Sequence, residues 1–274
     1  MKNYLLLFLL FLTYFVHSQN FQDKAKYLAV YELTHQPDST NKDWKKTERL
    51  RLYIGGKYSL FSSEGIVIKD SLMQNIDRSN RSMGAFARLQ KQVPQTEFNY
   101  KIYKGIPSGK ITYAEKIVKD TYRFAEEKNL MSWQILSESK RIAGYIVQKA
   151  TTSFRGRNYT AWFTSDIPIS EGPYKFNGLP GLILEIADEK KHYSFSLLEF
   201  KILNKPRSID FEAEKFQKVS RKELRKAKEN YKRDPITAVE QNGITFKFEP
   251  GQREKLHKEH LKKIEAENNP LEKI

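Results

Sequence analysis

Short runs of alternating apolar and polar residues, separated by turn residues, constrain the fold of this chain more than any other feature. They recur at intervals of about ten residues, a spacing typical of antiparallel β-structure. Because the connections are short and polar, they favour a meander over parallel strands joined by helices. We therefore expect a mainly β fold, an antiparallel curved sheet or half-barrel meander with C-terminal helices (α+β). The runs cover residues 26–33, 48–63, 97–105, 110–120, 141–154, 158–164, 182–187 and 192–200.

Glycine and proline mark the expected turns. Gly55-Gly56 is typical of a tight hairpin with positive φ angles, and Pro107-Ser108-Gly109 is a second turn signal. Leu179-Pro180-Gly181-Leu182 fits a type II β-turn, because proline fixes φ at the second position and glycine takes the positive φ required at the third. We interpret this turn either as a structural element or as part of a binding rim.

The last part of the chain is rich in helix-forming residues. Residues 211–235 contain no glycine, and no proline before Pro235, so they predict a helix. Asp234 and Pro235 suit the start of a further helix that stops at Gly243, although Asn242-Gly243 also fits a hairpin turn. Residues 71–92 lack strand alternation and predict an irregular or helical excursion. The expected division is a signal peptide at 1–18, an antiparallel β domain at 19–205 and a basic, mostly helical region at 206–274.

The N-terminus carries a short apolar block behind one lysine, Lys2. The block is too short to span a bilayer, which needs about 20 residues. It ends near a small residue, Ser18, so residues 1–18 predict a cleaved signal peptide. No second apolar run of membrane length follows in the sequence. We expect an exported, periplasmic or secreted protein whose mature chain has no transmembrane segment.

The chain has no cysteine and a formal net charge of +15. An exported chain without cysteine has no disulfide framework and depends on its core for stability. The positive charge attracts anionic surfaces such as lipid headgroups, envelope polysaccharide or nucleic acid. Export argues against nucleic acid. The basic C-terminal region therefore predicts either a solvated helix face or contact with an envelope protein or an anionic surface.

The hexapeptide from Gly178 to Ile183 and the segment before it carry a family resemblance. The chain resembles the GLPGLI family of exported Bacteroidetes-type proteins over residues 142–186. The resemblance implies export but no mechanism, since its members have no established activity. It also implies a cysteine at the position of Val147 in many relatives, so the valine here speaks against a thiol-dependent function. The matching pairs include Gly144-Tyr145, Lys149-Ala150, Gly156-Arg157, Ala161-Trp162, Ile167-Pro168 and Gly172-Pro173.

Aromatic residues crowd around the hexapeptide. A curved sheet with one face lined by aromatic side chains can hold an apolar, peptide or glycan ligand in its concavity. An ordinary filled core has the same composition, and both interpretations stay open here. The candidate ligand or motif residues are Tyr159, Trp162, Phe163, Asp166, Pro168, Gly172, Pro173, Tyr174, Phe176, Gly178, Leu179, Pro180 and Gly181.

Signals of catalysis are weak. The G-x-S-x-G motif of serine hydrolases is absent from the sequence, as is cysteine. His257 and His260 are spaced for one helical face, but the lysines around them disfavour a cation. Asp166 and Glu171 are a carboxylate pair whose separation the sequence does not fix. We expect no catalytic residue, no cofactor and no metal.

Two functions compete on this basis. The first is an exported, non-catalytic binding or accessory protein of the cell envelope that holds an unknown ligand in the sheet concavity. The second is an envelope interaction protein that uses its basic C-terminal helices on a partner or an anionic surface. A hydrolase that uses the loop carboxylates Asp166 and Glu171 is the third.

Overall fold

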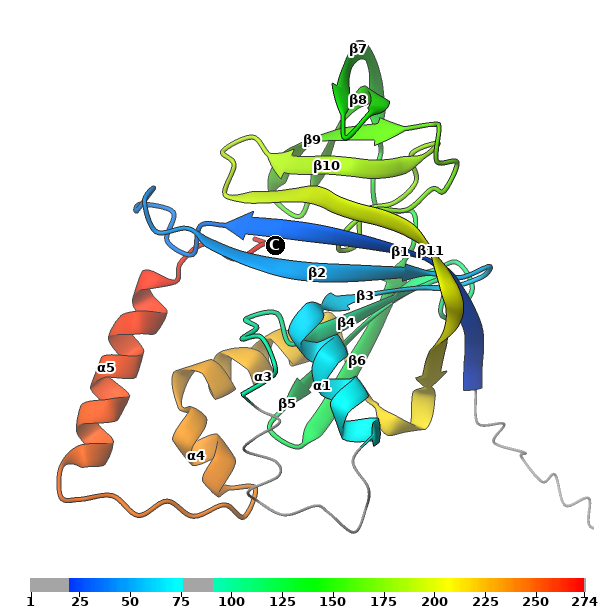
Figure 1. Ribbon diagram of the computed structural model, residues 1–274. Helices are drawn as coiled ribbons and strands as arrows, with labels where there is room; N and C mark the ends of the chain where they lie inside the picture. The colour runs from blue at the N-terminus through cyan, green and yellow to red at the C-terminus, as the bar shows by residue number, and fades with distance from the viewer. Residues whose placement is uncertain (1–19, 76–90, 274) are drawn as a thin grey trace, which may run out of the picture.

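The computed structural model describes residues 20–75 and 91–273, which contain one sheet of twelve strands (Figure 1). The order across the sheet is β12-β6-β5-β4-β3-β2-β1-β11-β10-β9-β8-β7. Neighbouring strands are antiparallel except for β12 and β6, which are parallel. The bounds are β1 (Asn20–His35), β2 (Lys46–Ile54), β3 (Ser59–Ser63), β4 (Tyr100–Lys104), β5 (Lys110–Ile117), β6 (Asp120–Glu127), β7 (Gln134–Ile142), β8 (Tyr145–Phe154), β9 (Arg157–Thr164), β10 (Leu182–Asp188), β11 (Tyr193–Glu212) and β12 (Gln217–Lys218).

The fold is mostly β, one large mixed sheet that is not closed, with helices toward the C-terminus. The prediction of a mainly β fold with C-terminal helices is therefore confirmed. Strand β1 lies in the middle of the sheet, where Tyr31 pairs with Leu50 of β2 on one side and with Leu197 of β11 on the other. Strands β12 and β7 form the two edges.

Alternate residues of β1 point into two apolar clusters. Tyr31 and Leu33 belong to the larger cluster, whereas Leu28 and Val30 belong to the smaller one. This division follows from the strand geometry, in which successive side chains point to opposite faces. Helix α1 (Glu64–Asn75) contributes the buried Val67 to the smaller cluster. Both faces of the central strand are thereby covered.

The segment between β9 and β10, residues 165–181, forms part of the larger cluster. Its Ile167, Tyr174, Phe176 and Leu179 are all buried there. Burial of one large apolar side chain stabilises a fold by about 1.5–3 kcal/mol. This loop is therefore a part of the core, although it contains neither helix nor regular strand.

The turn at Gly55-Gly56 joins β2 to β3 as predicted, but neither glycine has a positive φ. The carboxylate of Asp23 shapes this turn by accepting hydrogen bonds from the backbone N–H groups of Lys57 (2.6 Å) and Tyr58 (2.9 Å). A Cβ atom at Gly55 would lie 2.4 Å from that carboxylate. Glycine is thus required by the close approach of Asp23, and the prediction of positive φ angles is wrong.

Three helices follow the sheet: α3 (Arg221–Arg233), α4 (Pro235–Glu240) and α5 (Gln252–Ala266). Helix α3 begins with a capping box between Ser220 and Glu223, which satisfies backbone N–H groups at the helix start. Helix α4 begins where the carboxylate of Asp234 accepts a hydrogen bond from the N–H of Thr237 at 3.0 Å. The predicted helix after Asp234 is confirmed.

The prediction of a helix from residue 211 onward is wrong for residues 211–220. There β11 continues to Glu212, and a short 3-10 turn (Ala213–Lys215) leads into β12. Phe211 pairs with Phe21 of β1 and is buried in the smaller cluster. Pairing and burial therefore override helix propensity, and the helix starts only at Arg221.

Among residues 20–75 and 91–273, no helix is long and apolar enough to cross a membrane. The predicted signal peptide at 1–18 lies outside the described residues, as does most of the predicted excursion at 71–92. The described beginning of that excursion, residues 71–75, is the end of helix α1, which agrees with the helical alternative.

Candidate functional site

Strand β9 separates apolar from polar side chains by alternation. Tyr159 and Phe163 are buried in the larger cluster. Asn158 and Thr160 point the other way, and they are exposed and partly exposed respectively. The strand therefore presents a polar surface on the side opposite the core.

The neighbouring strands extend this surface. The register of the sheet places Thr151 of β8 beside Thr160 of β9, and Ser153 beside Asn158. Gln134, at the start of β7, pairs with Thr151. We call these five residues the polar face. Cross-strand pairing thus gathers hydroxyl and amide groups from three strands in two adjacent rows.

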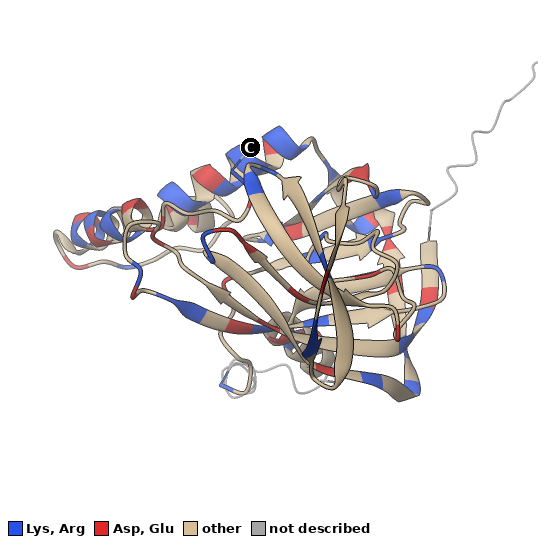
Figure 2. Ribbon diagram, turned by 90° about the horizontal axis from the view of Figure 1, so that it is seen from above, with Lys and Arg blue, Asp and Glu red and all other residues tan. Residues whose placement is uncertain are grey.

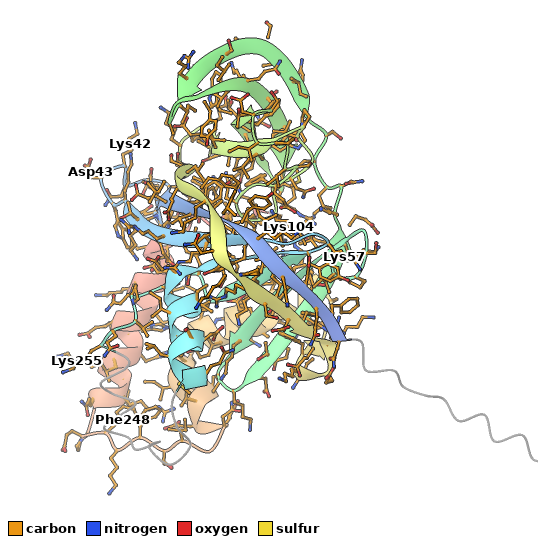
Figure 3. The ribbon with its side chains drawn as sticks, turned by 45° about the vertical axis from the view of Figure 1, so that its right-hand side comes forward. Lys42, Asp43, Lys57, Lys104, Phe248 and Lys255 are labelled. Atoms are coloured by element: carbon orange, nitrogen blue, oxygen red, sulfur yellow. The ribbon has the colours of Figure 1, made fainter. Side chains whose placement is uncertain are left out.

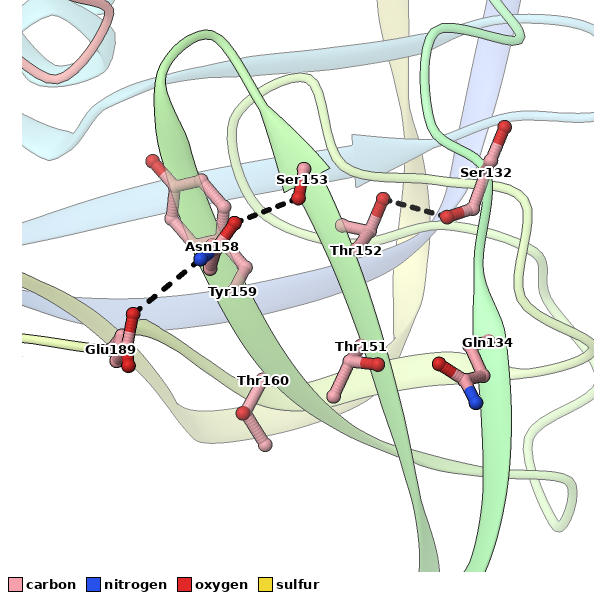
Figure 4. Close-up of a pocket in the computed structure, with 9 residues that line it drawn as sticks. All are labelled: Ser132, Gln134, Thr151, Thr152, Ser153, Asn158, Tyr159, Thr160 and Glu189. Atoms are coloured by element: carbon pink, nitrogen blue, oxygen red, sulfur yellow. Dashed lines mark hydrogen bonds between the residues drawn. The ribbon is translucent and has the colours of Figure 1, made fainter.

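A groove of about 550 Å³ lies at the polar face (Figure 4). Ser153 Oγ donates a hydrogen bond to Asn158 Oδ1 at 2.7 Å, and Asn158 Nδ2 donates to Glu189 Oε2 at 3.5 Å. Glu189 is the one charged residue among those that line the groove. The lining residues are Ser132, Gln134, Thr151, Thr152, Ser153, Asn158, Tyr159, Thr160 and Glu189.

Trp162 lies next to the groove on the same side of β9, because it follows Thr160 by two positions. It is partly buried. The ammonium group of Lys140 stands 4.4 Å from the centre of its indole ring, a cation–π contact. Lys140 also pairs with Glu185 at 2.8 Å. Trp162 therefore presents an aromatic surface, and the charge of the lysine beside it is balanced by Glu185.

A buried lysine holds the loop between β9 and β10 in place. Lys104 Nζ donates to Glu171 Oε2 at 2.7 Å, to the carbonyl of Gly172 at 2.7 Å and to the carbonyl of Phe176 at 3.0 Å. Glu171 also accepts from Ser59 Oγ at 3.0 Å. Figure 3 shows Lys104 among the packed side chains of the sheet. One side chain thereby fixes two carbonyl groups of the loop.

The aromatic residues chosen from the sequence fall into two groups. Tyr159, Phe163, Tyr174 and Phe176 are buried in the larger cluster, where Phe176 makes edge contacts with Tyr159 (ring centroids 4.8 Å apart). Trp162 differs because it is on the opposite side of β9 and only partly buried, although part of it packs against the larger cluster. The structure therefore brings four of these aromatics together as packed core, and places the fifth beside the groove.

The other candidate residues lie along the loop from residue 166 to residue 181. Asp166 is exposed. Its expected carboxylate partner, Glu171, is buried and paired with Lys104, so the two carboxylates occupy different environments. Gly172, Pro173, Leu179 and Gly181 are buried, and Pro168, Gly178 and Pro180 are exposed.

The turn around Gly181 differs from the predicted type II turn. The N–H of Gly181 donates to the carbonyl of Leu179 at 2.8 Å, which closes a three-residue γ-turn centred on Pro180. Its φ is not positive, whereas that of Gly178 is +97°. A Cβ atom at Gly181 would stand 2.0 Å from the carbonyl oxygen of Thr164. Glycine is thus needed for close backbone approach, and the type II assignment is wrong.

His35 and His260 serve packing and a local hydrogen bond. His35 lies edge-on to Phe98 and is stacked on Tyr193, and burial lowers its pKa against the opposing effect of Glu97. A nitrogen of His260 lies 2.6 Å from the carbonyl of Lys232. Within the part of the chain that the structure describes, no group of three or more His, Cys, Asp or Glu residues is placed to hold a metal ion.

Sequence reasoning missed the hydroxyl and amide residues of the groove. A signal for them exists, because Asn158, Thr160 and Trp162 stand at alternate positions of one strand. It missed the buried lysines Lys104 and Lys175 as well, whose side chains are fully buried. Lysine is almost never fully buried without a partner, so neither position could be recognised before its carboxylate was placed.

Fold and site together define a mostly β protein with a polar groove across β8 and β9. Its loop at 165–181, which we call the core-filling loop, forms part of the core. Residues 153–185 match a family described as a protein of unknown function (Porph_ging). This stretch begins in β8, includes β9 and the core-filling loop, and ends in β10. The chain is similar to that family over this stretch. No curated protein matches.

A solved structure shows a similar fold. The structure of PNGF-II in space group C2 has a TM-score of 0.52 and 14% identity, over 76% of this chain and 33% of that chain. The structure of PNGF-II in space group P21 has a TM-score of 0.49 and 14% identity, over 74% and 33% respectively. The chain thus spans one third of the length of PNGF-II. At this identity the likeness concerns the fold alone.

Proposed function

We propose that this protein is an exported, non-catalytic binding or accessory protein of the cell envelope that holds a hydroxyl-rich, glycan-like ligand at its polar face. The observation that supports this most is the lining of the groove, where hydroxyl and amide side chains surround one carboxylate, Glu189. Serine and threonine hydroxyls both donate and accept hydrogen bonds, and asparagine and glutamine do the same with two groups. A sugar hydroxyl needs that combination of partners.

The size of the groove and its neighbour Trp162 support the same ligand class. Its volume of about 550 Å³ lies within the range of small-ligand sites, about 300–1,000 Å³. The C–H groups on one side of a sugar ring form an apolar patch that packs against a flat aromatic surface. Trp162 offers such a surface next to Thr160 once Lys140 turns aside, and Lys140 is itself 41% exposed.

The charge of the groove favours a neutral ligand. Its lining contains one acidic residue, Glu189, and no lysine or arginine. A sulfated or phosphorylated glycan would meet the negative charge of Glu189 without a compensating cation from the lining. An apolar ligand has less support, because the aromatic residues of the loop are packed against one another in the core.

A glycan array probed with the labelled protein tests this function. Neutral oligosaccharides should give signal above acidic ones. Thr151→Val with Thr160→Val keeps side-chain size and removes two hydroxyls from the groove, so the signal should fall. Thr47→Val removes an exposed hydroxyl from β2, outside the lining, and should change nothing. Absence of neutral-glycan binding by the wild type, or equal binding by the double variant, would contradict the proposal.

A second function, contact of the C-terminal helices with an anionic surface, is favoured by a separate observation. Ile244 and Phe246, in the segment between α4 and α5, and Leu256 of α5 are large apolar residues that are 53%, 41% and 41% exposed. Lysine and arginine are frequent along the C-terminal helices (Figure 2). Exposed apolar side chains among basic residues are the composition with which a surface helix binds anionic lipid. This function uses a different part of the molecule from the groove.

A further inference from the structure

The chain after helix α5 runs as an extended tail against the body of the protein. Residues 267–273 contain neither helix nor strand. Figure 1 shows the C-terminus lying against the sheet beyond α5. The backbone N–H of Asn269 donates to the carbonyl of Pro37 at 3.1 Å, and that of Lys273 donates to the carbonyl of Arg155 at 3.0 Å. The tail is therefore held at both ends by main-chain hydrogen bonds.

Asn269 is recognised through its side chain as well. Its Nδ2 donates to the carbonyl of Gln36 at 2.7 Å, and its Oδ1 accepts from Arg157 Nη2 at 2.7 Å. The residue is 4% exposed. Its backbone carbonyl accepts from Tyr193 Oη at 2.7 Å. Because both ends of the amide are used in a buried site, a side chain without an amide would leave a buried polar group unpaired.

Arg157 binds the backbone carbonyl groups of the two residues that follow Asn269. It donates to the carbonyls of Pro270 at 2.6 Å and of Leu271 at 3.0 Å. It keeps an ion pair with Asp188 at 2.9 Å. These contacts place no demand on the side chains at the two positions, apart from the packing of Leu271 against the larger cluster.

We call the surface that holds residues 267–273 the tail site. The amide of Asn268 accepts from Ser39 and donates to Asp38 at its exposed end. Glu272, like Asn269, has buried partners there. One of its carboxylate oxygens accepts from Tyr174 Oη and Lys175 Nζ, both at 2.7 Å, and the other accepts from Arg221 Nη2 at 2.7 Å. The side chain of Lys175 is completely buried. Three converging donors, two of them charged, select a carboxylate over a neutral group.

Several ion pairs among the residues of the tail site do not involve the tail. Arg157 would retain Asp188, and Lys175 would retain its ion pair with Glu126 at 2.5 Å. Arg221 lies on the surface end of this cluster, with 31% of its side chain exposed. Glu126 also pairs with Arg155 at 2.7 Å, so Lys175 and Arg155 share one carboxylate. The tail site is therefore left with excess positive charge when Glu272 departs, which favours entry of another carboxylate.

The arm that carries the tail buries little apolar surface, although Glu267 at its end pairs with Lys232 at 3.0 Å. Helix α5 has no buried residue. The segment before it includes two glycines at positive φ, Gly243 (+87°) and Gly251 (+78°). Elements with little apolar burial open locally at a lower free energy than the core. The tail can accordingly leave the tail site without unfolding of the sheet.

We propose that the tail site binds an extended peptide of the pattern Asn-X-X-Glu. Residues 269–272 of the chain itself fill it here, and such a segment in a partner protein can replace them by exchange. This site is separate from the polar face and does not depend on a glycan ligand. The tail competes at an effective concentration of the order of millimolar, as short flexible links provide. A partner segment therefore binds only when it is concentrated or makes further contacts.

Fluorescence anisotropy of a labelled synthetic peptide with the sequence of residues 267–273 tests the site in the full-length protein. The variant Asn269→Ala with Glu272→Ala weakens its own tail and should bind the peptide, whereas the wild type should not at the same micromolar concentration. Glu265→Ala removes a carboxylate from the exposed side of α5 and should behave as wild type. A peptide with glutamine in place of its second glutamate should bind the double variant about tenfold more weakly. The proposal would be overturned if the folded double variant does not bind the peptide, or if it binds both peptides equally.

Hydrogen exchange of the wild type gives an answer that does not depend on variants. The amides of Asn269 and Lys273, which donate to body carbonyls, should exchange by local opening, faster than amides of the central strands. Excess unlabelled peptide should accelerate their exchange, because it occupies the tail site whenever the tail has dissociated. If these amides exchange only with global unfolding, the tail is a fixed strap and no exchange site exists.

Discussion

Lys104 Nζ lies 2.7 Å from Glu171 Oε2 in the interior of the protein, where the lysine side chain is completely buried and the glutamate is 9% exposed. Burial lowers the pKa of Lys104, and Glu171 opposes this effect. The same ammonium group donates to two carbonyls of the core-filling loop. The pair therefore connects β4 to the loop whose residues match the family of unknown function.

Removal of one member of this pair should be costly. Lys104→Met leaves the buried carboxylate of Glu171 with only the partly exposed Lys128, 3.6 Å away, as a cationic partner. Loss of the buried member of such a pair destabilises a protein by about 3–5 kcal/mol. Lys104→Met combined with Glu171→Leu removes both charges and should recover part of the loss. Urea denaturation of the three proteins measures this. A neutral single variant, or a double variant less stable than the single one, would contradict the assigned role.

Gly181 should not tolerate even one added methyl group. Gly181→Ala places a Cβ atom 2.0 Å from the carbonyl oxygen of Thr164, so β9 and the loop must separate. Overpacking of this kind costs about 1–3 kcal/mol. Gly56→Ala is the matched control, because its Cβ meets nothing within 4 Å and its φ is not positive. The control should be neutral or slightly stabilising in thermal denaturation, and equal effects at both sites would speak against the close approach.

Trp162 and Phe163 are neighbours on β9 with different predicted contributions. Phe163→Ala leaves a cavity in the larger cluster and should cost about 3–5 kcal/mol. Trp162→Ala removes a partly exposed ring on the opposite side, so its loss of stability should be smaller. Chemical denaturation compares the two, and the glycan array shows whether Trp162→Ala weakens ligand capture. A larger loss of stability for Trp162→Ala would assign the indole to the core.

Glu272 should make the docked tail sensitive to acid. Burial alone would raise the pKa of Glu272, but the charges of Lys175 and Arg221 and the hydroxyl of Tyr174 together hold it below its ordinary value of 4.5. A carboxyl with a depressed pKa in the folded state adds stability above pH 4.5, and this contribution is lost as the pH falls through the folded pKa. The stability advantage of wild type over Glu272→Gln should therefore be constant near neutral pH and shrink below pH 4.5. An advantage that persists unchanged to lower pH would contradict the ion cluster.

Binding of the basic helices to anionic lipid should depend on salt. Sedimentation with vesicles that contain anionic lipid should show binding that weakens between low and physiological ionic strength, since screening shortens the range of the attraction. Phe246→Ser with Leu256→Ser removes exposed apolar groups and should weaken binding further. Vesicles of neutral lipid are the control. Undetectable or salt-insensitive binding would leave these helices as a solvated surface.

Most of the sheet could be predicted from the sequence because its pairing is local. Consecutive strands joined by short turns, such as β8 and β9 around Arg155-Gly156-Arg157, reveal themselves by alternation and turn residues. The start of helix α3 could not be predicted. Residues 211–220 have helix propensity, yet Phe211 is drawn into the sheet by its pairing with β1.

The candidate site was predictable only in part. Trp162 was selected from the sequence and lies beside the groove, whereas Thr151 and Asn158 meet only after the register of β8 and β9 is known. The roles of Gly55 and Gly181 were misread because both are dictated by a distant group, the carboxylate of Asp23 and the carbonyl of Thr164. Local turn rules contain no information on such a neighbour.

The pairing of β1 with β11 determines the order in which this sheet can assemble. Strands β1 to β6 form one consecutive meander and β7 to β11 form another, so each can assemble from contacts that are close in sequence. The β1–β11 pairing, from Asn20 opposite Glu212 to His35 opposite Tyr193, joins the two meanders by the most distant contacts of the sheet. Distant contacts form slowly because a long loop must close first. Until this seam closes, each meander presents a long unpaired edge, so the yield of folded protein depends on how quickly the two edges meet.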